Sequence, residues 1–387
     1  MNYERIIKEI GTPTYVFDTE TLLKRVKYLK SMFHKNINMV YAVKANTFIA
    51  KEIEESVERF EICSPGEFEI CEKLNIDHKK MVISGVYKDR PTIEHMISNF
   101  EDIGKYTIES ITQWGLLTEL VKKYNKKINV LIRLTSGNQF GVNEEDFLYI
   151  VNNNDNNYIT IEGLEYFSGT QKHSLKRITK EIDYIKEFVN KVETETPLKI
   201  KEIEYGPGLP VYYFQDDEFD EDTFLKEISD IIGKISDKVI SLEIGRSIAA
   251  SCGTYLTKVV DIKTNKNGNF ALVDGGINHL VYYGGTMAMR IPYFEIYPAR
   301  SGEKVTYNLY GSLCTINDIL MKNININKLN IGDTFIFKNV GAYSSTEGIS
   351  LFLSRDLPKV VICNNKKQLT IVREIQKTSV LNLPQYK

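Results

Sequence analysis

The chain has 387 residues, a formal net charge of −2 at pH 7 and a hydrophobic content of 42%, which is enough for a large domain with a sizeable core and a smaller second domain. The balanced charge, without a basic face, predicts no nucleic-acid partner. The N-terminus lacks a signal-peptide pattern and no apolar run is long enough for a membrane span, so a cytoplasmic protein without a membrane partner is expected. Five scattered cysteines without metal-like spacing predict reduced thiols and no metal site.

Short runs rich in β-branched and aromatic residues alternate with amphipathic segments of helical length through much of the chain. The runs predicted as strands are Asn38–Val43, Arg59–Cys63, Lys80–Ser84, Tyr106–Ile108, Ile128–Leu134, Ile159–Phe167, Ile200–Tyr205 and Val239–Glu243. The helical segments between them include Glu67–Leu74, Ile111–Lys122, Leu175–Val192 and Glu221–Ile235. Eight such β–α units predict a (β/α)8 TIM barrel over residues 22–262, with a doubly wound open sheet as the alternative.

The sequence changes character after Lys263, where short strand-like runs and turn signals replace the β–α alternation. The runs are Ala271–Val273, Val305–Leu309, Thr334–Phe337, Lys359–Cys363 and Gln368–Val372. They predict a C-terminal β-sandwich or β-barrel domain over residues 263–387. The N-terminal run Thr14–Phe17 precedes the first predicted barrel helix, Glu20–Ser31, and is predicted to join this β-domain with the rest of residues 1–21.

Lys44 directly follows the first predicted barrel strand, in the run Tyr41-Ala42-Val43-Lys44-Ala45-Asn46. Active-site residues of TIM barrels gather at the C-terminal ends of the strands. A desolvated lysine amine at such a position can condense with an aldehyde to form a Schiff base. A solvated charge is the alternative for a lysine that ends a strand.

Three glycine-containing turns follow other predicted strands: Ser168-Gly169-Thr170, Gly206-Pro207-Gly208 and Gly245-Arg246. Glycine lets backbone N–H groups approach an anion closely, and the N-terminus of a following helix adds a partial positive charge. The alternative is that glycine only allows the turn between a strand and a helix and binds no ligand. Together with Lys44 and the acidic Glu243 on the same rim, these turns favour a phosphorylated aldehyde cofactor with a ring nitrogen, which is pyridoxal 5'-phosphate.

The chain resembles the fold-type III pyridoxal-phosphate decarboxylases, the group that contains diaminopimelate, ornithine and arginine decarboxylases. The resemblance covers nearly the whole chain and rests on motifs in the family's order. The motifs are Tyr41-Ala42-Val43-Lys44-Ala45-Asn46, Ser64-Pro65-Gly66-Glu67, Phe140-Gly141, Phe167-Ser168-Gly169-Thr170-Gln171, Gly206-Pro207-Gly208, Glu243-Ile244-Gly245-Arg246, Val273-Asp274-Gly275-Gly276, Gly311-Ser312-Leu313-Cys314 with Asp318, and Gly341-Ala342-Tyr343. It implies an amino-acid decarboxylase that works as a homodimer with shared active sites.

The resemblance implies a role for each motif. Lys44 would carry the cofactor as a Schiff base, and Glu243 would face the ring nitrogen and keep it protonated. Arg133, Glu61 and Glu67 are candidates near the ring and its supporting shell, although Glu67 can also be a first-turn acid that favours the helix dipole. The residues implied to hold the phosphate are Gly208, Gly245, Arg246, Thr170 and Tyr343.

Cys314 would come from the partner subunit and deliver a proton after CO2 leaves; a buried, inert thiol is the alternative. The proton-delivery role would make an active monomer impossible and would require a homodimer. The segment from Cys314 to Asp318 favours decarboxylation over the alternative of an amino-acid racemase, which needs a base on each face of the ring. A non-catalytic regulatory homologue is a further alternative. The arguments against it are the intact Lys44, Glu243, Arg246 and Cys314.

Departures from the family pattern bear on the substrate. Phe167 stands where the decarboxylases carry a ring-stacking histidine, and its aromatic face would stack on the cofactor instead. Thr315 replaces the acidic residue that grips the distal amine of diamino acids. The segment Ile277-Asn278-His279-Leu280 lacks the arginine that helps to hold a distal carboxylate. The candidate substrate contacts are Thr315, Asp318, Asn278, His279 and Tyr343.

At these segments the chain resembles a divergent branch of the family more than it resembles the diamino-acid decarboxylases. That branch includes decarboxylases of antibiotic and siderophore assembly, among them the glutamyl–carrier-protein decarboxylase of butirosin biosynthesis. In that branch the distal end of the amino acid is conjugated to another group, so that a charged distal clamp is unnecessary. The resemblance therefore predicts α-decarboxylation of an amino acid with a conjugated or carrier-tethered distal group. It also predicts that free diaminopimelate and free ornithine are poor substrates.

Overall fold

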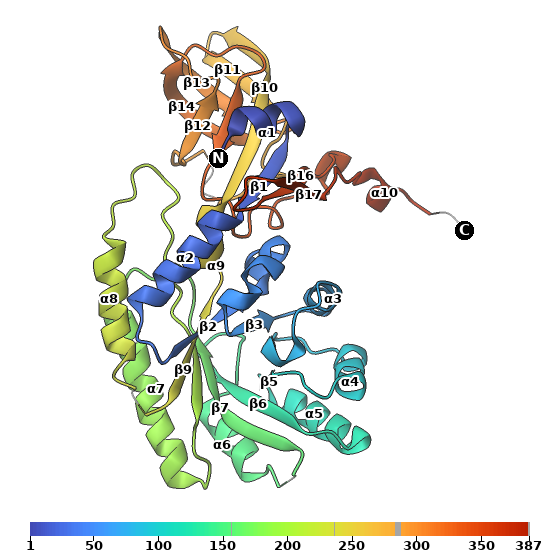
Figure 1. Cartoon of the computed structure of the whole chain (residues 1–387), viewed down its shortest axis with the longest axis vertical. Helices are drawn as coiled ribbons and strands as arrows, with labels where there is room; N and C mark the ends of the chain where they lie inside the picture. Colours follow the sequence, from blue (N-terminus) through green and yellow to red (C-terminus); the bar gives the residue numbers. More distant parts are fainter. Residues whose placement is uncertain (156, 236, 283–287, 386–387) are drawn as a thin grey trace. The chain divides into compact units, whose positions relative to one another are not determined.

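The computed structural model describes residues 1–155, 157–235, 237–282 and 288–385, and Figure 1 labels their helices and strands. The chain divides into two compact units. One unit consists of Val26–Pro210 and Asp220–Ile248, and the other of Met1–Arg25, Val211–Phe219 and Ala249–Lys387. Among the described helices, none combines the length and the apolar character that a membrane span requires.

Eight parallel strands of the first unit close into a barrel in the order in which they follow along the described chain. They are β2 (Ile37–Ala42), β3 (Arg59–Ile62), β4 (Met81–Ile83), β5 (Lys105–Ile108), β6 (Ile128–Leu134), β7 (Ile159–Phe167), β8 (Glu202–Gly206) and β9 (Val239–Ile244). The pairing of β9 with β2, which places Val40 opposite Glu243, closes the ring. The predicted TIM barrel is confirmed, and the predicted strands overlap the observed ones closely.

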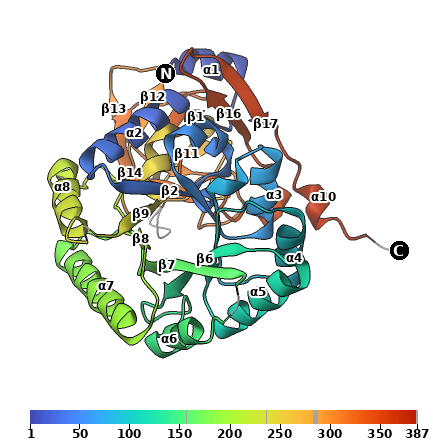
Figure 2. The same cartoon turned by 60° about the horizontal axis from the view of Figure 1, so that its bottom comes forward.

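Helices connect the barrel strands, and Figure 2 shows α4 to α8 arranged around them. In chain order the helices from α2 to α9 are α2 (Thr19–Met32), which precedes β2, then α3 (Pro65–Lys73), α4 (Arg90–Asn99), α5 (Ile111–Tyr124), α6 (Glu144–Asn152), α7 (Leu175–Glu195), α8 (Glu221–Ile232) and α9 (Arg246–Ala249), which follows β9. The longest of these, α7, begins after Ser174, whose side chain accepts a hydrogen bond from the Arg177 N–H. Its buried residues Ile178, Ile182 and Ile185 recur at helical spacing, so α7 buries one apolar face.

The interior of the barrel is charged, whereas branched apolar residues dominate the interior of most TIM barrels. Polar residues occupy alternate positions of strands, as in Arg59-Phe60-Glu61 and Glu202-Ile203-Glu204, and alternate positions share one face of a strand. Near the N-terminal ends of the strands, buried Arg59 donates to buried Glu202, and Lys105 Nζ lies 2.7 Å from the same carboxylate. These ion pairs offset the free-energy cost of desolvating the charges.

The second unit contains a mixed sheet of nine strands in the described part of the chain. Seven lie on one path in the order β14 (Ile319–Asn327), β13 (Lys304–Tyr310), β11 (Gly268–Val273), β10 (Gly253–Asn265), β1 (Thr14–Asp18), β16 (Lys359–Cys363) and β17 (Leu369–Arg373). The remaining two are β15 (Thr334–Phe337), which pairs with β10, and β12 (Phe294–Tyr297), which pairs with β15. The strand β1 lies between β10 and β16, so the N-terminal strand is part of this sheet.

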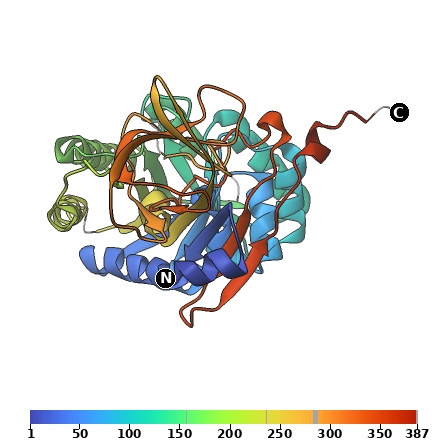
Figure 3. The same cartoon turned by 90° about the horizontal axis from the view of Figure 1, so that it is seen from above.

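Apolar residues from distant parts of the sequence form a core cluster of this sheet unit. Its members include Ile6, Val16, Leu256, Ile336 and Val361. Figure 3 shows the N-terminal helix α1 (Tyr3–Glu9) beside the sheet, and α1 contributes Ile6 to the cluster. The short helix α10 (Ser379–Asn382) lies near the C-terminus.

Three strands of the sheet, β10, β12 and β14, have no counterpart among the strands predicted from the sequence. β10 pairs antiparallel with β1, from Thr14 opposite Leu256 to Phe17 opposite Gly253, and the C-terminal segment of the sheet unit begins at Ala249. The predicted boundary between residues 262 and 263 therefore falls inside β10. Its partner β1 lies at the other end of the sequence, so the local pattern did not distinguish β10 from a further barrel element.

Candidate active site

Lys44 lies in a 3-10 turn, Val43–Ala45, directly after β2. Its Nζ is 2.6 Å from Glu61 Oε2, 3.2 Å from Glu243 Oε1 and 3.6 Å from Cys63 Sγ. The side chains converge because β2 lies between β3 and β9 in the barrel. The sequence predicts a desolvated amine, whereas the Lys44 side chain is 37% exposed and is held by two buried carboxyl groups.

Glu61 and Glu243 are both buried, but their pKa values are shifted in opposite directions. Burial raises the pKa of Glu243 to about 8, and the adjacent Glu61 carboxylate adds to this effect. Burial also acts to raise the pKa of Glu61, but the Lys44 ammonium group and a hydrogen bond from the Cys63 thiol contribute to lowering it to about 2. At neutral pH Glu61 is therefore the carboxylate that binds Lys44, and Glu243 holds a proton.

This difference predicts a pH-dependent effect of Glu243→Gln on the cofactor-free protein. A carboxyl group whose pKa is raised on folding makes the folded state less stable as the pH rises from its ordinary value of 4.5 to about 8. Glutamine does not titrate, so the melting temperature of the variant minus that of wild type should increase over this range and then level off. This difference in melting temperature is measured by thermal unfolding of both proteins at a series of pH values.

Glu61→Gln is the matched control for this prediction. Because the pKa of Glu61 is lowered to about 2, its carboxylate stabilises the fold above the ordinary pKa of 4.5, and this contribution is lost as the pH falls toward 2. We therefore expect Glu61→Gln to lower the melting temperature at neutral pH. Equal and pH-independent effects of the two variants would contradict the assigned protonation states.

Two glycine-containing turns lie at the ends of the neighbouring strands β7 and β8. The first turn is Ser168-Gly169-Thr170, after β7, and the second is Gly206-Pro207-Gly208, at the end of β8. The backbone N–H groups of Gly169, Thr170, Gly208 and Leu209 have no hydrogen-bond acceptor among the residues that the structure describes. Gly208 has a φ of +61°, and a Cβ there would collide with the Gly169 carbonyl oxygen. Arg246 Nε donates to Thr170 Oγ1 at 3.3 Å. Free backbone donors next to a guanidinium group suit the binding of a phosphate.

Gly245 allows a second close approach on this rim. A Cβ on Gly245 would lie 2.9 Å from Ala45 Cβ, in the turn that carries Lys44. A larger residue would therefore push the Arg246 turn away from the Lys44 turn. This contact keeps the amine and the guanidinium on one rim.

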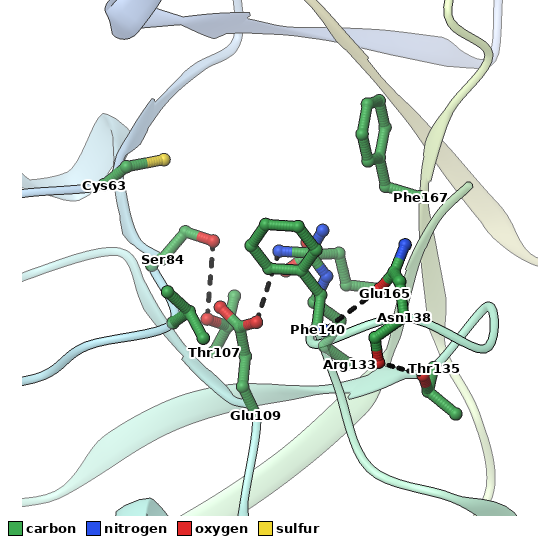
Figure 4. Close-up of polar contacts among 12 residues, drawn as sticks. Cys63, Ser84, Thr107, Glu109, Arg133, Thr135, Asn138, Phe140, Glu165 and Phe167 are labelled. Atoms are coloured by element: carbon green, nitrogen blue, oxygen red, sulfur yellow. Dashed lines mark hydrogen bonds and ion pairs between the residues drawn. The ribbon is translucent and has the colours of Figure 1, made fainter. Parts of the chain in front are cut away.

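Arg133 lies in a buried charged cluster with Glu109 and Glu165, which Figure 4 shows in close-up. Its guanidinium nitrogens are 3.4 Å from Glu109 Oε2 and 3.2 Å from Glu165 Oε1. The ring centres of Phe140 and Phe167 lie 4.7 Å and 5.9 Å from the guanidinium carbon. Burial raises the pKa of Glu165 to about 7 against the opposing charge of Arg133. Arg133 is thus bound by the barrel interior, and its contact with the cofactor ring stays a prediction.

Cys314 lies in the sheet unit, in the loop between β13 and β14, and it is exposed. The exposure argues against the alternative of a buried, inert thiol. Asp318 is buried and accepts hydrogen bonds from the backbone N–H groups of Leu313, at 2.7 Å, and Ile277, at 2.8 Å. Its carboxylate therefore shapes the loop that presents Cys314, which does not favour the predicted contact between Asp318 and substrate.

His279 is buried in the same unit and is held on both sides of its ring. Nδ1 lies 2.9 Å from the Tyr255 hydroxyl, and Nε2 lies 2.8 Å from the Asp356 carbonyl oxygen. Burial lowers the pKa of His279 to about 4, so the ring is neutral at physiological pH. These contacts make His279 a structural residue and do not favour its predicted contact with substrate. Asn278 is also buried, and its side-chain amide has no partner in the described chain.

Tyr343 has a φ of +64°, which aromatic residues rarely adopt. Its carbonyl oxygen accepts from the N–H groups of Thr346, at 2.8 Å, and Glu347, at 3.0 Å. The turn after Gly341-Ala342 is thus stabilised by its own backbone hydrogen bonds. Strain of this kind is often retained where a side chain must be presented for function.

A family model described as "Pyridoxal-dependent decarboxylase, C-terminal sheet domain" matches residues 14–341 of the chain. The chain belongs to the pyridoxal-dependent decarboxylases. The predicted family, the enzyme class and the cofactor are confirmed by this match. It favours decarboxylation over the alternatives of a racemase and of a non-catalytic homologue.

Two curated relatives and one solved structure illustrate the similarity. The diaminopimelate decarboxylase of Methanocaldococcus jannaschii is 26% identical over 95% of this chain and 90% of its own. The L-glutamyl-[BtrI acyl-carrier protein] decarboxylase of Niallia circulans is 26% identical over 93% of this chain and 90% of its own. The structure of diaminopimelate decarboxylase from Helicobacter pylori, complexed with L-lysine, matches with a TM-score of 0.86 at 21% identity and covers 98% of both chains. This last likeness supports the fold.

The residues on the barrel rim of this decarboxylase fit pyridoxal 5'-phosphate. An amine at Lys44, a buried carboxyl group at Glu243 and the free N–H groups of two turns offer partners for an aldehyde, a ring nitrogen and a phosphate. When bound, the cofactor supplies the aldehyde that captures the substrate amine and the ring that accepts electrons as CO2 leaves. The chain's own residues orient Lys44 through Glu61 and hold a proton at Glu243.

Sequence reasoning missed several residues of the decarboxylase site, among them the half-buried Cys63 and the buried Lys88. Cys63 Sγ donates to Glu61 Oε1 at 3.0 Å. Lys88 Nζ donates to the Gly85 carbonyl oxygen at 2.9 Å, and burial lowers the pKa of Lys88 to about 8. The alternation Arg59-x-Glu61-x-Cys63 was an available signal, since alternate positions of a strand share one face.

Proposed function

We propose that the protein removes the α-carboxyl group of an amino acid whose distal end is conjugated to another group or tethered to a carrier protein. The observation that carries this proposal is the absence of a negative charge from the loop that presents Cys314. Residues 311–317 contain no charged side chain, and the carboxylate of the adjoining Asp318 is committed to two backbone N–H groups. A distal ammonium group has no carboxylate in this loop with which to pair.

The charge beside the same loop is positive. Arg355 is exposed, and its Nη2 donates to the Ser312 carbonyl oxygen at 2.8 Å. A guanidinium group here repels a distal ammonium group and favours an uncharged or anionic distal group. The similarity to a decarboxylase of a carrier-bound glutamyl group supports this choice, and the equal identity to a diaminopimelate decarboxylase makes free diaminopimelate the comparison substrate for the test.

The proposal assigns roles to residues of the barrel rim and to Tyr343, which belongs to the sheet unit. Lys44 carries the cofactor, Glu61 orients its amine, and Glu243 faces the ring nitrogen. Phe167 stacks on the ring. The phosphate is held by Gly208, Gly245, Arg246, Thr170 and Tyr343.

The proposal also includes a homodimer in which Cys314 of one subunit serves the site of the other. The Cys314 thiol donates its proton to the carbon that has lost CO2, so that a hydrogen takes the place of the carboxylate. The thiolate that remains then takes up a proton from water. In support, Cys314 is exposed and the adjacent Ile316 is 86% exposed, which suits a loop that a second subunit covers. The proposal assigns the contact with the distal part of the substrate to Thr315, next to Cys314.

A CO2-release assay on the reconstituted protein tests the substrate class. It compares free meso-diaminopimelate and free ornithine with side-chain-conjugated and carrier-bound amino acids. We expect the free diamino acids to be poorer substrates by roughly 10- to 100-fold in kcat/KM, because a charge-assisted contact to the distal amine is missing. A kcat/KM for either free diamino acid of about 10^4 M^-1 s^-1 or more would contradict the proposal.

Thr315→Glu tests the position that we assign to the distal group. The new carboxylate should raise kcat/KM for free ornithine and lower it for a conjugated substrate. Asn317→Glu is the matched control. Asn317 is exposed in the same loop, and this variant adds the same charge two residues away from position 315. Equal effects of the two variants would show a general influence of charge and not a contact from position 315.

A further inference from the structure

Beneath the two glycine-containing turns lies a buried charged cluster centred on Glu181 of α7. The Glu181 carboxylate accepts hydrogen bonds from Lys172 Nζ at 2.7 Å, the Tyr205 hydroxyl at 2.7 Å and Arg177 Nε at 3.1 Å. It also accepts from the hydroxyl of Ser168 in the first turn. The side chain of Lys172 is 1% exposed and that of Glu181 is 8% exposed. The proposed catalytic roles leave this ion pair unused.

Lys172 connects the cluster to both turns. It lies two residues after Thr170, and its backbone N–H donates to the Gly208 carbonyl oxygen of the second turn at 2.9 Å. Its Nζ donates to the Gly206 carbonyl oxygen at 3.2 Å. Because a trans peptide unit is planar, its N–H points opposite to its carbonyl oxygen. Holding the Gly208 carbonyl toward the backbone of Lys172 therefore directs the Leu209 N–H away from that backbone. The ammonium group instead holds the Gly206 carbonyl, whose peptide unit leads to Pro207 and carries no N–H, so this bond fixes the end of β8 from which the second turn leaves.

Arg177 acts on the first turn in the same way. Its Nη2 donates to the Ser168 carbonyl oxygen at 2.7 Å, while its Nε is held by Glu181. The peptide unit that follows Ser168 carries the N–H of Gly169, which is therefore directed away from Arg177. The N–H groups of Gly169 and Leu209 are two of the donors without an acceptor in the described chain.

Each member of the buried pair shifts the pKa of the other toward its charged form. Burial lowers the pKa of Lys172, but the adjacent Glu181 carboxylate opposes this shift. Burial alone would raise the pKa of Glu181, and Lys172 lowers it below its ordinary value. A buried ion pair adds little stability relative to apolar residues of similar volume, and fixing a specific geometry is one reason to retain it.

We propose that Lys172 and Glu181 are positioning residues that hold the two turns in the conformation that binds the cofactor phosphate. The inference rests on the proposed role of these turns as the phosphate site. It assigns part of the phosphate affinity to a lysine that is buried beneath the turns. The N–H groups are held ready before the ligand arrives, so that less ordering is needed on binding.

Lys172→Met tests this role, because methionine preserves much of the side-chain volume and removes the charge. Dissociation constants for pyridoxal 5'-phosphate and for pyridoxal, which lacks the phosphate, are measured on the full-length cofactor-free protein by visible absorbance. We expect the dissociation constant for the phosphorylated form to rise by about tenfold or more, in the range of one lost charge-assisted hydrogen bond. That for pyridoxal should change by less than about twofold.

Lys176→Met is the matched control, since Lys176 is an exposed lysine in the first turn of α7 and its removal changes the net charge equally. Neither dissociation constant should change in this variant. If breaking the ion pair prevents folding, the double variant Lys172→Met/Glu181→Gln removes both charges and should show the same selective loss.

Equal losses of affinity for the two ligands, or no loss for either, would overturn the inference and leave the cluster with a packing role. Failure of the wild-type protein to bind pyridoxal 5'-phosphate more tightly than pyridoxal would instead contradict the proposed phosphate site. The two failures are therefore distinguishable in one set of titrations.

Discussion

Lys44→Ala should lower the rate of decarboxylation by roughly a thousandfold or more, because the variant lacks the amine that we assign to the cofactor aldehyde. The wild-type protein should be yellow when loaded, and borohydride should attach the cofactor permanently to the peptide that contains Lys44. In the variant this attachment should disappear. Absorbance spectra, peptide mapping after reduction and CO2 release measure the three effects.

Lys88 makes the mapping experiment decisive. Unlike the partly exposed Lys44, Lys88 is a buried amine in the loop after β4, and its lowered pKa of about 8 makes it the alternative nucleophile. Lys44 differs in having two carboxyl groups within 3.2 Å of its Nζ. Finding the reduced cofactor on Lys88 would overturn the assignment of Lys44, and finding it on no lysine would overturn the proposed chemistry.

Mixing inactive Lys44→Ala with inactive Cys314→Ala should restore up to about a quarter of the wild-type activity. If each site takes Lys44 from one subunit and Cys314 from the other, a mixed dimer has one intact site and one site with both defects. Random exchange makes half of the dimers mixed, and half of their sites are active. Activity is measured after subunit exchange at several mixing ratios, with the maximum expected at equal amounts.

Each variant alone is the control for the mixing experiment, and a tagged subunit reports the exchange itself. Substantial activity of Cys314→Ala alone would exclude the thiol as the required proton donor. Activity that fails to reappear although exchange has occurred would show that both residues serve the same site from one chain. Either result would contradict the shared site.

The sequence by itself determined the barrel and the position of its rim. Each barrel strand is a short local run followed by a helical segment, so a pattern of neighbouring residues is sufficient to find it. Lys44, Glu243 and the glycines of the turns could be located in the same way, because they directly follow or end such strands. The family motifs then related these positions to pyridoxal 5'-phosphate, and the family model agrees with that assignment.

The tertiary structure alone decided features that depend on residues far apart in the chain. The strand β10 belongs to the sheet unit because it pairs with β1, at the other end of the sequence. The protonation of Glu243 depends on its burial beside Glu61, from a strand on the other side of β2.

The roles of Asp318 and Lys172 depend on tertiary structure for the same reason. The sequence shows an acidic residue after a cysteine and a lysine after a glycine turn, but it does not show which backbone groups they bind. Asp318 binds the N–H of Ile277 and thereby joins two loops, while Lys172 binds carbonyl oxygens of the turn after β8. The free energy of a buried charge is set by partners that only folding brings within hydrogen-bond distance, and no local pattern encodes those partners.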